Sequence, residues 1–496
     1  MFFNSIDYFI FFVFVVLCVH AVRERYYQHL ILLAASLYFY WTSADTLITI
    51  LFYVSLVSYY CGGKIHEYDS DDRKRKIFLV ISIVSTLSVL AFFKYFNFAV
   101  DSVNALFSTL HLPYPPIIVL QVALPVGISF YTFEDLSYIF DIYLRKVAPA
   151  ENYFDYIMFV AFFPKLVAGP VVTAHEFIPQ LKKPLVITAE NVKLGVIRII
   201  IGVMKKVVIA DNVGYYVDLV FSNPSTPIRQ SNSFFIISAT ILFGLQIYFD
   251  FSGYVDIALG SGKILGFWFP ENFDNPYLAA TPTEFWRKWN ITISRFIRNY
   301  LYIPMGGNRK GRARTYVNLV FSMVVCGIWH GAAWNFALWG LYHGIVLALH
   351  KIVGAVKVAF LEAHRNIHFL AGVIVTQILV FIGWILFRVK DIPDILYCIN
   401  KVIFIDIHSI LNGLSKYSDI ISINAVFFVP VIIAVLVISY KKRWWAVDFR
   451  SSTEFDYIGY IAGLNYRYLT LFFAAMILAI MCLAPSSSPE FIYFQF

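Results

Sequence analysis

The sequence predicts an all-α protein that crosses a membrane many times, and three observations lead to this prediction. Of the 496 residues, 59% are hydrophobic and only 14% are charged, whereas about 25% of the residues of an ordinary soluble domain are charged. The 49 Phe and 33 Tyr residues are spread along the whole chain and are not confined to one anchor segment. Apolar runs long enough to span a bilayer recur from the beginning of the chain to its end. We therefore treat the membrane as the solvent for most of this polypeptide.

Candidate spans were sought as runs of about 20 mostly apolar residues. The clearest are residues 8–22, 29–41, 47–60, 77–93, 234–249, 317–329, 334–349, 369–387, 427–440 and 469–483. Weaker runs cover residues 117–133, 154–168 and 194–213, where proline and basic residues interrupt the apolar pattern: Pro125, Pro164, Lys165, Arg198, Lys205 and Lys206. Such interruptions are typical of broken, re-entrant or interfacial helices. We expect about 11 transmembrane helices in all, together with helices of this second kind.

The basic residues near the N-terminus predict how the chain enters the membrane. Residues 1–7 contain no Lys or Arg, unlike the start of a secretory signal peptide, so the first apolar run should remain as a membrane helix. Arg23 and Arg25 follow this run, and a basic cluster at residues 73–76 follows the third. Because cytoplasmic loops carry an excess of Lys and Arg, both loops should face the cytoplasm and the N-terminus should lie outside.

Composition also argues against several other classes of protein. The five cysteines are scattered without a close pair, so we expect free, buried thiols and no metal site. The net charge of +8 is explained by basic cytoplasmic loops and contact with anionic membrane lipid, and we expect no nucleic-acid partner. No fixed-period repeat and no long linker divides the chain. Residues 1–496 are therefore predicted to form a single transmembrane domain.

The stretch from residue 285 to 314 is strongly basic and contains no Asp or Glu. Its first part, FWRKWNITISRFIRNYLY, is predicted to form one amphipathic or re-entrant helix at the membrane interface. That helix would place five side chains near two adjacent faces, with Trp286 and Asn290 on one and Arg287, Ser294 and Arg298 on the other. Two interpretations remain open. The stretch either anchors the protein to lipid headgroups or holds an anionic donor through its phosphate groups.

Four polar side chains close an otherwise apolar, aromatic helix in the segment LQIYFDFSGYVD: Gln246, Asp250, Ser252 and Asp256. Polar groups at membrane depth cost on the order of several kcal/mol unless they are paired or face water, so each is a functional candidate. The structural alternative makes the two acids ion-pair partners of the basic stretch that follows them. We expect this structural role for Asp256, and both roles remain open for Asp250.

Trp289 and Asn290, inside the basic stretch, form a second candidate position. The side-chain amide of Asn290 could donate a hydrogen bond to a developing oxyanion or orient an acceptor hydroxyl. The alternative is an ordinary asparagine of an interfacial helix, which has no part in chemistry.

Two histidines lie in the segment IWHGAAWNFALWGLYHG, which is predicted to be helical. On one continuous helix, His330 and His343 would lie about 140° apart around the axis and roughly 20 Å apart along it, so they should not share a site. His343 falls on the face of Trp339 and Asn335, as expected of a packed histidine. His330 lies beside Gly331, where a neutral imidazole is suited to deprotonate a hydroxyl group. A structural role for His330 remains the alternative.

Together these segments resemble the membrane-bound O-acyltransferase (MBOAT) family, and most closely its bacterial alginate O-acetyltransferase branch. The resemblance spans nearly the whole chain, with the core motifs at about residues 120–350. It rests on five segments in one order: LPVGISFYTFEDLSYIFDIY, FFPKLVAGPVV, LQIYFDFSGYVDIALGSGKILGFWFPENFDNPY, TEFWRKWNITISRFIRNYLYIPMGGNR and CGIWHGAAWNFALWGLYHG. The closing PEFIYFQF is also similar to the usual C-terminus of that branch.

The resemblance implies a fold and a set of site residues. The MBOAT fold is a ring of tilted helices around a central funnel, open to a donor from the cytoplasm and to an acceptor from the opposite side. In the family the histidine of the WHG motif is catalytic, which is His330 here, and a second polar position lies upstream, which is Asn290 here. The supporting residues expected in the funnel are Gln246, Asp250, Ser252, Asp256, Arg287, Trp289, Ser294, Arg298 and Trp334.

Three positions depart from the pattern of the bacterial branch. Asn290 stands where polysaccharide acetylases usually have His, and because an amide cannot act as a base, its expected role is hydrogen bonding. Lys165 stands where Gln is usual, and Glu134 with Asp135 stands where the family has less charged residues. The first departure leaves the acyltransferase assignment intact, whereas the other two bear on the substrate.

The resemblance further implies an enzyme that moves an acetyl group from a cytoplasmic thioester to an extracytoplasmic polysaccharide. Acetyl-coenzyme A would be the co-substrate, with no permanently bound cofactor, and His330 would deprotonate the acceptor hydroxyl. An extracytoplasmic SGNH-type acetyltransferase is the expected partner, and the bacterial cytoplasmic membrane is the expected location. Two alternatives remain open: D-alanyl transfer from a carrier protein to teichoic acid, and, in a different class, a transporter or flippase.

Overall fold

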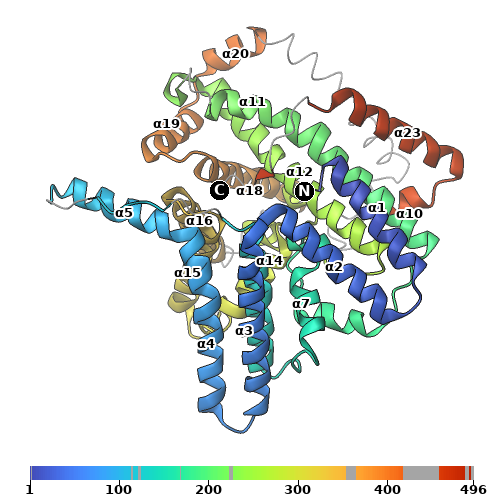
Figure 1. Ribbon diagram of the computed structural model, residues 1–496. Coiled ribbons are helices and arrows are strands. Elements are labelled where there is room, and N and C mark those ends of the chain that lie inside the picture. Colours follow the sequence, from blue (N-terminus) through green and yellow to red (C-terminus); the bar gives the residue numbers. More distant parts are fainter. Residues whose placement is uncertain are drawn as a thin grey trace.

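The structure is a computed structural model that describes residues 1, 3–112, 116–120, 124–167, 169–222, 227–353, 365–416, 457–485 and 491–492. Over these residues the chain is helical and contains no β-strand, only one isolated bridge between Phe273 and Trp289. Figure 1 shows α3 and α4 as a pair at the lower edge of the molecule, with α11, α12 and α18 crossing above them. The all-α prediction is confirmed.

The N-terminal third forms one group of packed helices. Three of them begin at capping side chains. The Ser5 hydroxyl oxygen accepts a hydrogen bond from the Tyr8 amide, the Asp71 carboxylate accepts one from the Lys74 amide, and the Asn152 side-chain oxygen accepts one from the Asp155 amide. The group comprises α1 (Ile6–Ala21), α2 (Arg25–Ala44), α3 (Ile48–Glu67), α4 (Asp72–Leu90), α6 (Ile128–Tyr143), α7 (Tyr153–Ala161) and α8 (Phe163–Leu166). After α4, the π-helical turn η2 (Ala91–Tyr95) leads into α5 (Phe96–Thr109), which extends away from this group (Figure 1).

The middle of the chain contains the helices that carry most of the candidate residues. They are α9 (Ala174–Phe177), α10 (Ala189–Val203), the π turn η4 (Met204–Ala210), α11 (Asp211–Phe221), α12 (Ser233–Ile264), α13 (Pro282–Lys288), α14 (Ile291–Ile297), the π turn η7 (Arg298–Tyr302), α15 (Arg312–His330) and α16 (Trp334–Val353). The remaining helices are α18 (Arg365–Arg388), α19 (Ile392–Ile403), α20 (Ile407–Lys416), α22 (Tyr457–Ala462) and α23 (Tyr466–Leu483). Short 3-10 turns connect some of them: η1 (Asp45–Leu47), η3 (Ile178–Lys182), η5 (Ile228–Gln230) and η6 (Pro276–Leu278).

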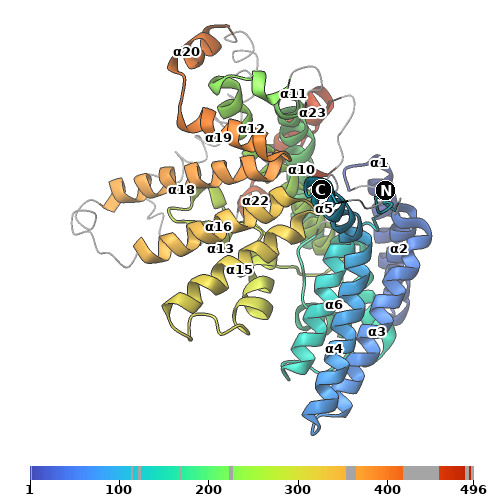
Figure 2. The same ribbon diagram turned by 90° about the vertical axis from the view of Figure 1, so that its left-hand side faces the viewer.

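Glycines bring the central helices unusually close together. A Cβ atom on Gly202 of α10 would lie 2.6 Å from the carbonyl oxygen of Gly253 on α12, and a Cβ atom on Gly253 would lie 2.7 Å from that of Gly202. In the hairpin of α15 and α16 (Figure 2), a Cβ atom on Gly327 would collide with the Phe336 carbonyl. Small residues at helix contacts are the usual means of close packing in a bilayer, where lipid tails are as apolar as the side chains.

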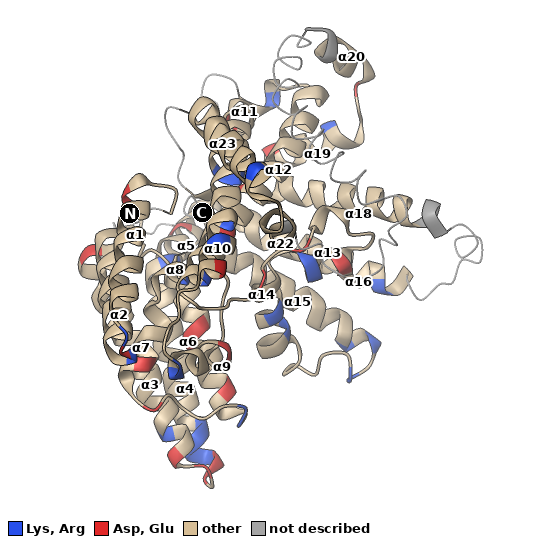
Figure 3. Cartoon of the chain, turned by 90° about the vertical axis from the view of Figure 1, so that its right-hand side faces the viewer, with Lys and Arg blue, Asp and Glu red and all other residues tan. Residues whose placement is uncertain are grey.

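The charged ends of α3, α4 and α6 are tied together. Arg75 donates a hydrogen bond to the Tyr143 carbonyl at 2.6 Å, and Arg145 donates one to Asp69 at 2.8 Å, which lowers the pKa of the Asp69 carboxyl. Figure 3 shows charged residues gathered at this end of α3 and α4, whereas the middle of both helices lacks them. The basic cluster at residues 73–76, which the sequence predicts to face the cytoplasm, lies in the first turn of α4.

The described residues contain six helical stretches that are long and apolar enough to cross a membrane: Arg25–Glu67, Asp72–Thr109, Ser233–Ile264, Trp334–Val353, Phe369–Arg388 and Tyr466–Leu483. The first two each join more than one helix, α1 is shorter, and the expected span at 427–440 lies outside the described residues. The expected total of about 11 stays a prediction. The run at 154–168 is broken between α7 and α8, as Pro164 predicts, whereas the described residues of the run at 117–133 are helical only from Ile128.

Apolar side chains cover much of the outer surface. On α1, Ile6 is 77% exposed and Phe14 is 65% exposed, and on α23, Met481 is 77% exposed. Exposed apolar faces of this extent are expected where helices contact lipid. All five cysteines are free as predicted, although only three are buried: Cys18 is half-buried and Cys482 is exposed.

Two of the residues that depart from the family pattern form a buried ion pair. The Lys165 ammonium lies 2.5 Å from the Glu134 carboxylate, and both side chains are at most 2% exposed. The ammonium also lies 4.7 Å from the ring centroid of Phe159, which adds a cation–π contact. The neighbouring Asp135 accepts a hydrogen bond from the Tyr156 hydroxyl. Each unusual charge is therefore accompanied by a partner that neutralises or binds it.

We expect Lys165→Gln to destabilise the protein strongly, because it leaves the Glu134 carboxylate buried without a cation, at a cost of roughly 3–5 kcal/mol. The double variant Lys165→Gln/Glu134→Gln removes both charges and should recover most of the loss. The midpoint of thermal unfolding in detergent, followed by size-exclusion chromatography with fluorescence detection, measures this. If the unfolding midpoint of the double variant falls by the sum of the decreases in the two single variants, the two charges do not depend on each other.

Candidate functional site

His330 is the last residue of α15, at the point where the chain turns back into α16. Its side chain is 4% exposed and is surrounded by aromatic rings, with ring centroids of Trp329 at 4.7 Å, Trp339 at 5.0 Å and Phe387 at 5.3 Å. A short segment, residues 331–333, separates the two helices. The catalytic candidate therefore lies at a helix end inside the protein and not on its surface.

The two histidines lie close together, and the prediction that they are far apart is wrong. That prediction assumed one continuous helix, but the helix ends at His330 and α16 packs back along α15 as a hairpin. The ring centroid of Trp339 lies 5.0 Å from that of His330 and 5.0 Å from that of His343, so one indole contacts both imidazoles. The packed environment predicted for His343 is present, since Trp286 also contacts its ring at 5.1 Å.

Asn290 lies at a break in the basic stretch, and the prediction of one amphipathic helix there is also wrong. α13 ends at Lys288, α14 begins at Ile291, and Asn290 between them adopts the left-handed conformation with φ of 44°. Asparagine tolerates this conformation better than most residues. The Asn290 side chain is 2% exposed, and Asn272 holds the start of α14 by accepting a hydrogen bond from the Thr292 amide.

Tryptophan rings connect the neighbourhood of Asn290 to that of His330. Trp289 lies 5.0 Å from Trp384, which lies 6.4 Å from Trp339, all measured between ring centroids. Trp339 is in turn the ring that contacts His330. The two catalytic candidates therefore border one continuous aromatic cluster, which we define as Trp286, Trp289, Trp329, Trp339 and Trp384.

Several polar atoms around this cluster are buried without a hydrogen-bond partner among the described residues. They are Asn290 Oδ1, His343 Nε2, and the indole nitrogens of Trp329, Trp339 and Trp384. Buried polar groups are nearly always hydrogen-bonded, and each exception needs a reason. Unused hydrogen-bonding capacity gathered beside two candidate residues is typical of a place where a substrate supplies the missing partners.

The two acids of α12 are held by ion pairs, but not with the basic stretch at 285–314. Asp256 lies 3.0 Å from Arg198 and 2.6 Å from Lys205, and Asp250 lies 2.7 Å from Lys206. The partners come from α10 and η4, which precede α12, because the close glycine contact brings these elements together. The structural role expected for Asp256 is present, with this correction of its partners.

The C-terminal segment reaches Asp250 as well. The Ile492 amide donates a hydrogen bond to Asp250 Oδ2 at 2.7 Å, and the Phe491 ring centroid lies 4.3 Å from that of Tyr254. Asp250 is thus occupied by a cation and a backbone amide, which favours the structural role that the sequence left open. On the same helix, Ser252 is buried, and Gln246 lies against Gly214 of α11.

The other supporting residues divide into two sets. Trp289 and Ser294 lie beside Asn290, and the Ser294 hydroxyl donates to the Trp289 carbonyl at 3.2 Å. Arg287 and Arg298 are exposed, and Trp334 is 60% exposed and packs against Phe98 at 5.4 Å. The structure therefore does not bring these last three side chains into the aromatic cluster, and their expected place in the funnel stays a prediction.

Lys94 and Tyr95, which the sequence patterns do not single out, bind the end of α15. Lys94 donates to the carbonyl oxygens of Trp329 at 2.6 Å and of His330 at 3.2 Å, and the Tyr95 hydroxyl donates to that of Ile328 at 2.9 Å. The last carbonyls of a helix have no partner within it, and a cation there also interacts favourably with the helix dipole. The signal in the sequence was a single lysine within the apolar run AFFKYFNF.

Comparison with known proteins identifies the family. The sequence model of the family described as "MBOAT, membrane-bound O-acyltransferase family" matches residues 33–388 of this chain. The chain belongs to the MBOAT family. It is an O-acyltransferase and a multi-pass membrane protein, and the alternative of a transporter or flippase is therefore set aside.

Individual relatives of this MBOAT protein carry more specific names. It is 38% identical over 371 residues to a probable alginate O-acetylase of Pseudomonas aeruginosa. The aligned region covers 74% of this chain and 68% of the relative. It is 34% identical over 428 residues to a peptidoglycan O-acetyltransferase of Helicobacter pylori, with 79% and 76% covered. A teichoic acid D-alanyltransferase of Bacillus subtilis is 25% identical over 240 residues, with 46% and 58% covered.

We expect Lys94→Met to lower acyl-transfer activity by roughly 10- to 100-fold, since displacement of a catalytic group by about 1 Å can cost that much. Lys94→Arg keeps a donor and a charge at the end of α15 and should retain activity within roughly threefold of the parent protein. The initial rate of transfer per mole of folded, monodisperse protein is the measurement. If both variants lose activity equally, the hydrogen bonds to the two carbonyls do not position His330.

Proposed function

We propose that this O-acyltransferase moves an acetyl group from a cytoplasmic thioester, acetyl-coenzyme A, across the membrane for O-acetylation of an extracytoplasmic polysaccharide. The observation that carries the proposal is the gathering of buried polar atoms without partners around the aromatic cluster that His330 and Asn290 border. The names of the relatives supply the acceptor class, because alginate and peptidoglycan are both polysaccharides whose hydroxyl groups accept acetyl.

The chemistry requires a base for the acceptor and a hydrogen-bond donor for the thioester carbonyl. In the proposed step, the imidazole of His330 takes the proton of the acceptor hydroxyl, and the oxygen attacks the thioester carbon. The C–S bond breaks, and the proton leaves on the thiol of coenzyme A. The Asn290 amide donates to the carbonyl oxygen as negative charge develops on it. Trp329, Trp339 and Phe387 exclude water from the imidazole, which protects the thioester from hydrolysis.

The basic residues at the ends of the first helices support an orientation of the protein in the membrane. Residues 22–24 and 68–71 connect helices at ends that carry Arg and Lys, which favours a cytoplasmic position for both and an extracytoplasmic N-terminus. The proposed location is the bacterial cytoplasmic membrane. The acceptor opening would then face outward, where an SGNH-type acetyltransferase could take the acetyl group on its serine and pass it to the polysaccharide.

D-alanyl transfer to teichoic acid is the second candidate function, supported by the D-alanyltransferase of Bacillus subtilis. The match to that protein covers 46% of this chain, whereas the matches to the polysaccharide acetylases cover 74% and 79% at higher identity. Acetyl transfer is the better supported of the two. A test with acetyl-coenzyme A and with a D-alanyl carrier protein as alternative donors separates them.

We expect His330→Ala to lower the rate of transfer from radiolabelled acetyl-coenzyme A to the polysaccharide by roughly 10²- to 10⁴-fold, the usual contribution of a general base. The matched control is His343→Gln, which alters the other buried histidine on Trp339 and should cost less than about tenfold. Both proteins must elute as the parent protein does on size exclusion. Equal rates in His330→Ala and the parent protein would contradict the assignment of the base.

We expect Asn290→His to keep substantial activity, within roughly tenfold of the parent protein. Histidine also accepts the left-handed conformation more readily than most residues, and it can donate a hydrogen bond from a ring nitrogen. Asn290→Leu removes the donor and should lower the rate by roughly 10²-fold or more, because the loss of one oxyanion donor has an effect of this size in other enzymes. The same transfer assay measures both, and complete loss in Asn290→His at normal membrane abundance would argue against a hydrogen-bonding role.

A further inference from the structure

A cavity of about 270 Å³ lies at the opposite end of the α15–α16 hairpin from His330. It is lined by Asn308, Gly311, Arg312, Thr315, Tyr316 and Lys351. Arg312 begins α15 and His330 ends it, so the cavity lies about 27 Å from His330 along the helix at 1.5 Å per residue. The cavity is therefore separate from the aromatic cluster.

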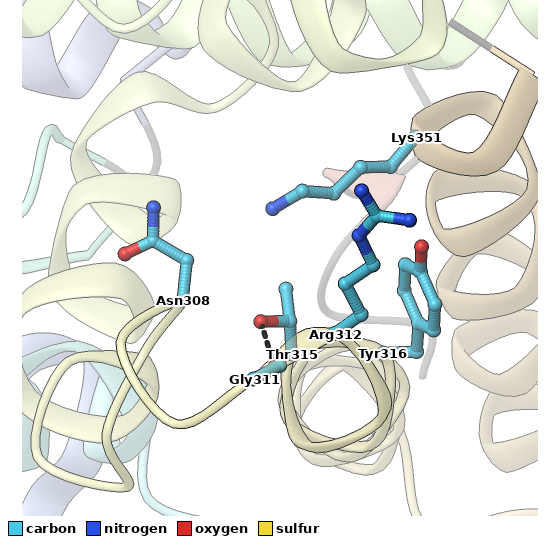
Figure 4. A pocket seen from close by; sticks show the side chains of 6 residues that line it. All are labelled: Asn308, Gly311, Arg312, Thr315, Tyr316 and Lys351. Atoms are coloured by element: carbon cyan, nitrogen blue, oxygen red, sulfur yellow. Dashed lines mark hydrogen bonds between the residues drawn. The ribbon is translucent and has the colours of Figure 1, made fainter. Parts of the chain in front are cut away.

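Two cations from different helices extend into this cavity. Figure 4 shows the guanidinium of Arg312 and the ammonium of Lys351 on the same side of the cavity, with Asn308 across from them and Thr315 at its floor. The Thr315 hydroxyl donates to the Gly311 carbonyl at 2.8 Å, which fixes the first turn of α15 below the two cations. The two helices thus hold two positive charges around one space.

Among the described residues, no acidic side chain offsets these charges. The sequence has no Asp or Glu from residue 285 to 361, and the lining contains none. Among the described residues, neither Arg312 nor Lys351 has a carboxylate within 4.0 Å, in contrast to Arg198, Lys205 and Lys206 of the central helices. With the amide of Asn308 and the hydroxyl of Tyr316 at the rim, the cavity offers donors to an anion with several oxygen atoms, such as a phosphate ester.

Apolar surface adjoins the cavity on both helices. Val317 and Phe321 of α15 are 56% and 47% exposed, and Leu349 and Ile352 of α16 are 54% and 46% exposed. In a membrane protein such exposed apolar side chains contact lipid acyl chains. Tyr316 lies between them and a basic loop, and tyrosines at such positions are typical of the depth of the lipid headgroups. These features are those expected of a cavity at the boundary between lipid tails and water.

We propose that this cavity binds the headgroup phosphate of an anionic membrane phospholipid, with the acyl chains along the exposed faces of α15 and α16. Basic cavities between membrane helices commonly hold anionic lipids in this way. Coenzyme A also carries phosphate groups, but it has no acyl chains that would use the adjoining apolar surface. Of the two uses that the sequence left open for the basic stretch, the structure favours lipid binding for its C-terminal part. The proposal does not depend on the proposed acyl transfer.

The test measures phospholipid binding to the purified protein in detergent by native mass spectrometry. Phosphatidylglycerol, phosphatidylcholine and coenzyme A are titrated separately. The double variant Arg312→Gln/Lys351→Gln should bind phosphatidylglycerol about 25-fold more weakly, at about fivefold for each cation. The control Arg73→Gln/Lys76→Gln removes the same charge from two exposed residues of α4 and should bind as the parent protein does.

A variant that keeps both charges, Arg312→Lys/Lys351→Arg, protects the test against loss of folding. It should bind phosphatidylglycerol within about fivefold of the parent protein, and phosphatidylcholine should bind more weakly than phosphatidylglycerol to both. Three results would overturn the proposal: equal affinity of the double glutamine variant and the parent protein, equal weakening by the α4 control, or weakening of coenzyme A binding alone.

Discussion

The position of His330 depends on how the protein satisfies the end of α15. A helix that ends inside an apolar protein leaves its last carbonyls without partners, and here Lys94 and Tyr95 of the π turn η2 supply the missing donors. The chain can then reverse within residues 331–333, and glycine at position 327 lets α16 pack directly on α15. One helix end, held from a distant segment, thereby places an imidazole against Trp339 and Phe387.

The buried polar groups of the protein fall into two sets: those paired with each other within the fold, and those around the candidate site. Asp250 and Asp256 are engaged by cations of α10 and η4, and Lys165 is engaged by Glu134. The last pair also accounts for two departures from the family pattern at once, because a buried lysine and a buried carboxylate neutralise each other. Around the aromatic cluster, by contrast, the Asn290 amide oxygen and the Trp339 indole nitrogen have no partners among the described residues. We infer that substrate binding uses this remaining capacity.

Much of the fold could be predicted from the sequence, because apolar runs, basic loops and interrupting prolines act locally. The all-helical class and the break between α7 and α8 follow from such patterns. The site was predicted as a set of residues but not as a geometry. Helical periodicity fails at Asn290 and after His330, where a left-handed residue and a chain reversal replace a helix. Partners such as Lys94 could not be found, since they depend on contacts between segments far apart in the sequence.

The most direct test of this account is a cryo-electron microscopy structure of the protein with a non-hydrolysable acetyl-coenzyme A analogue. If His330 is the base and Asn290 donates to the oxyanion, the carbonyl carbon of the analogue will lie within reach of the His330 imidazole. Its oxygen will lie at hydrogen-bonding distance from the Asn290 amide, and Trp339 will lie in the wall beside it. An analogue bound with its acyl group away from the aromatic cluster would contradict this mechanism. So would a His330 side chain that points away from the analogue while Lys94 and Tyr95 still bind the end of α15.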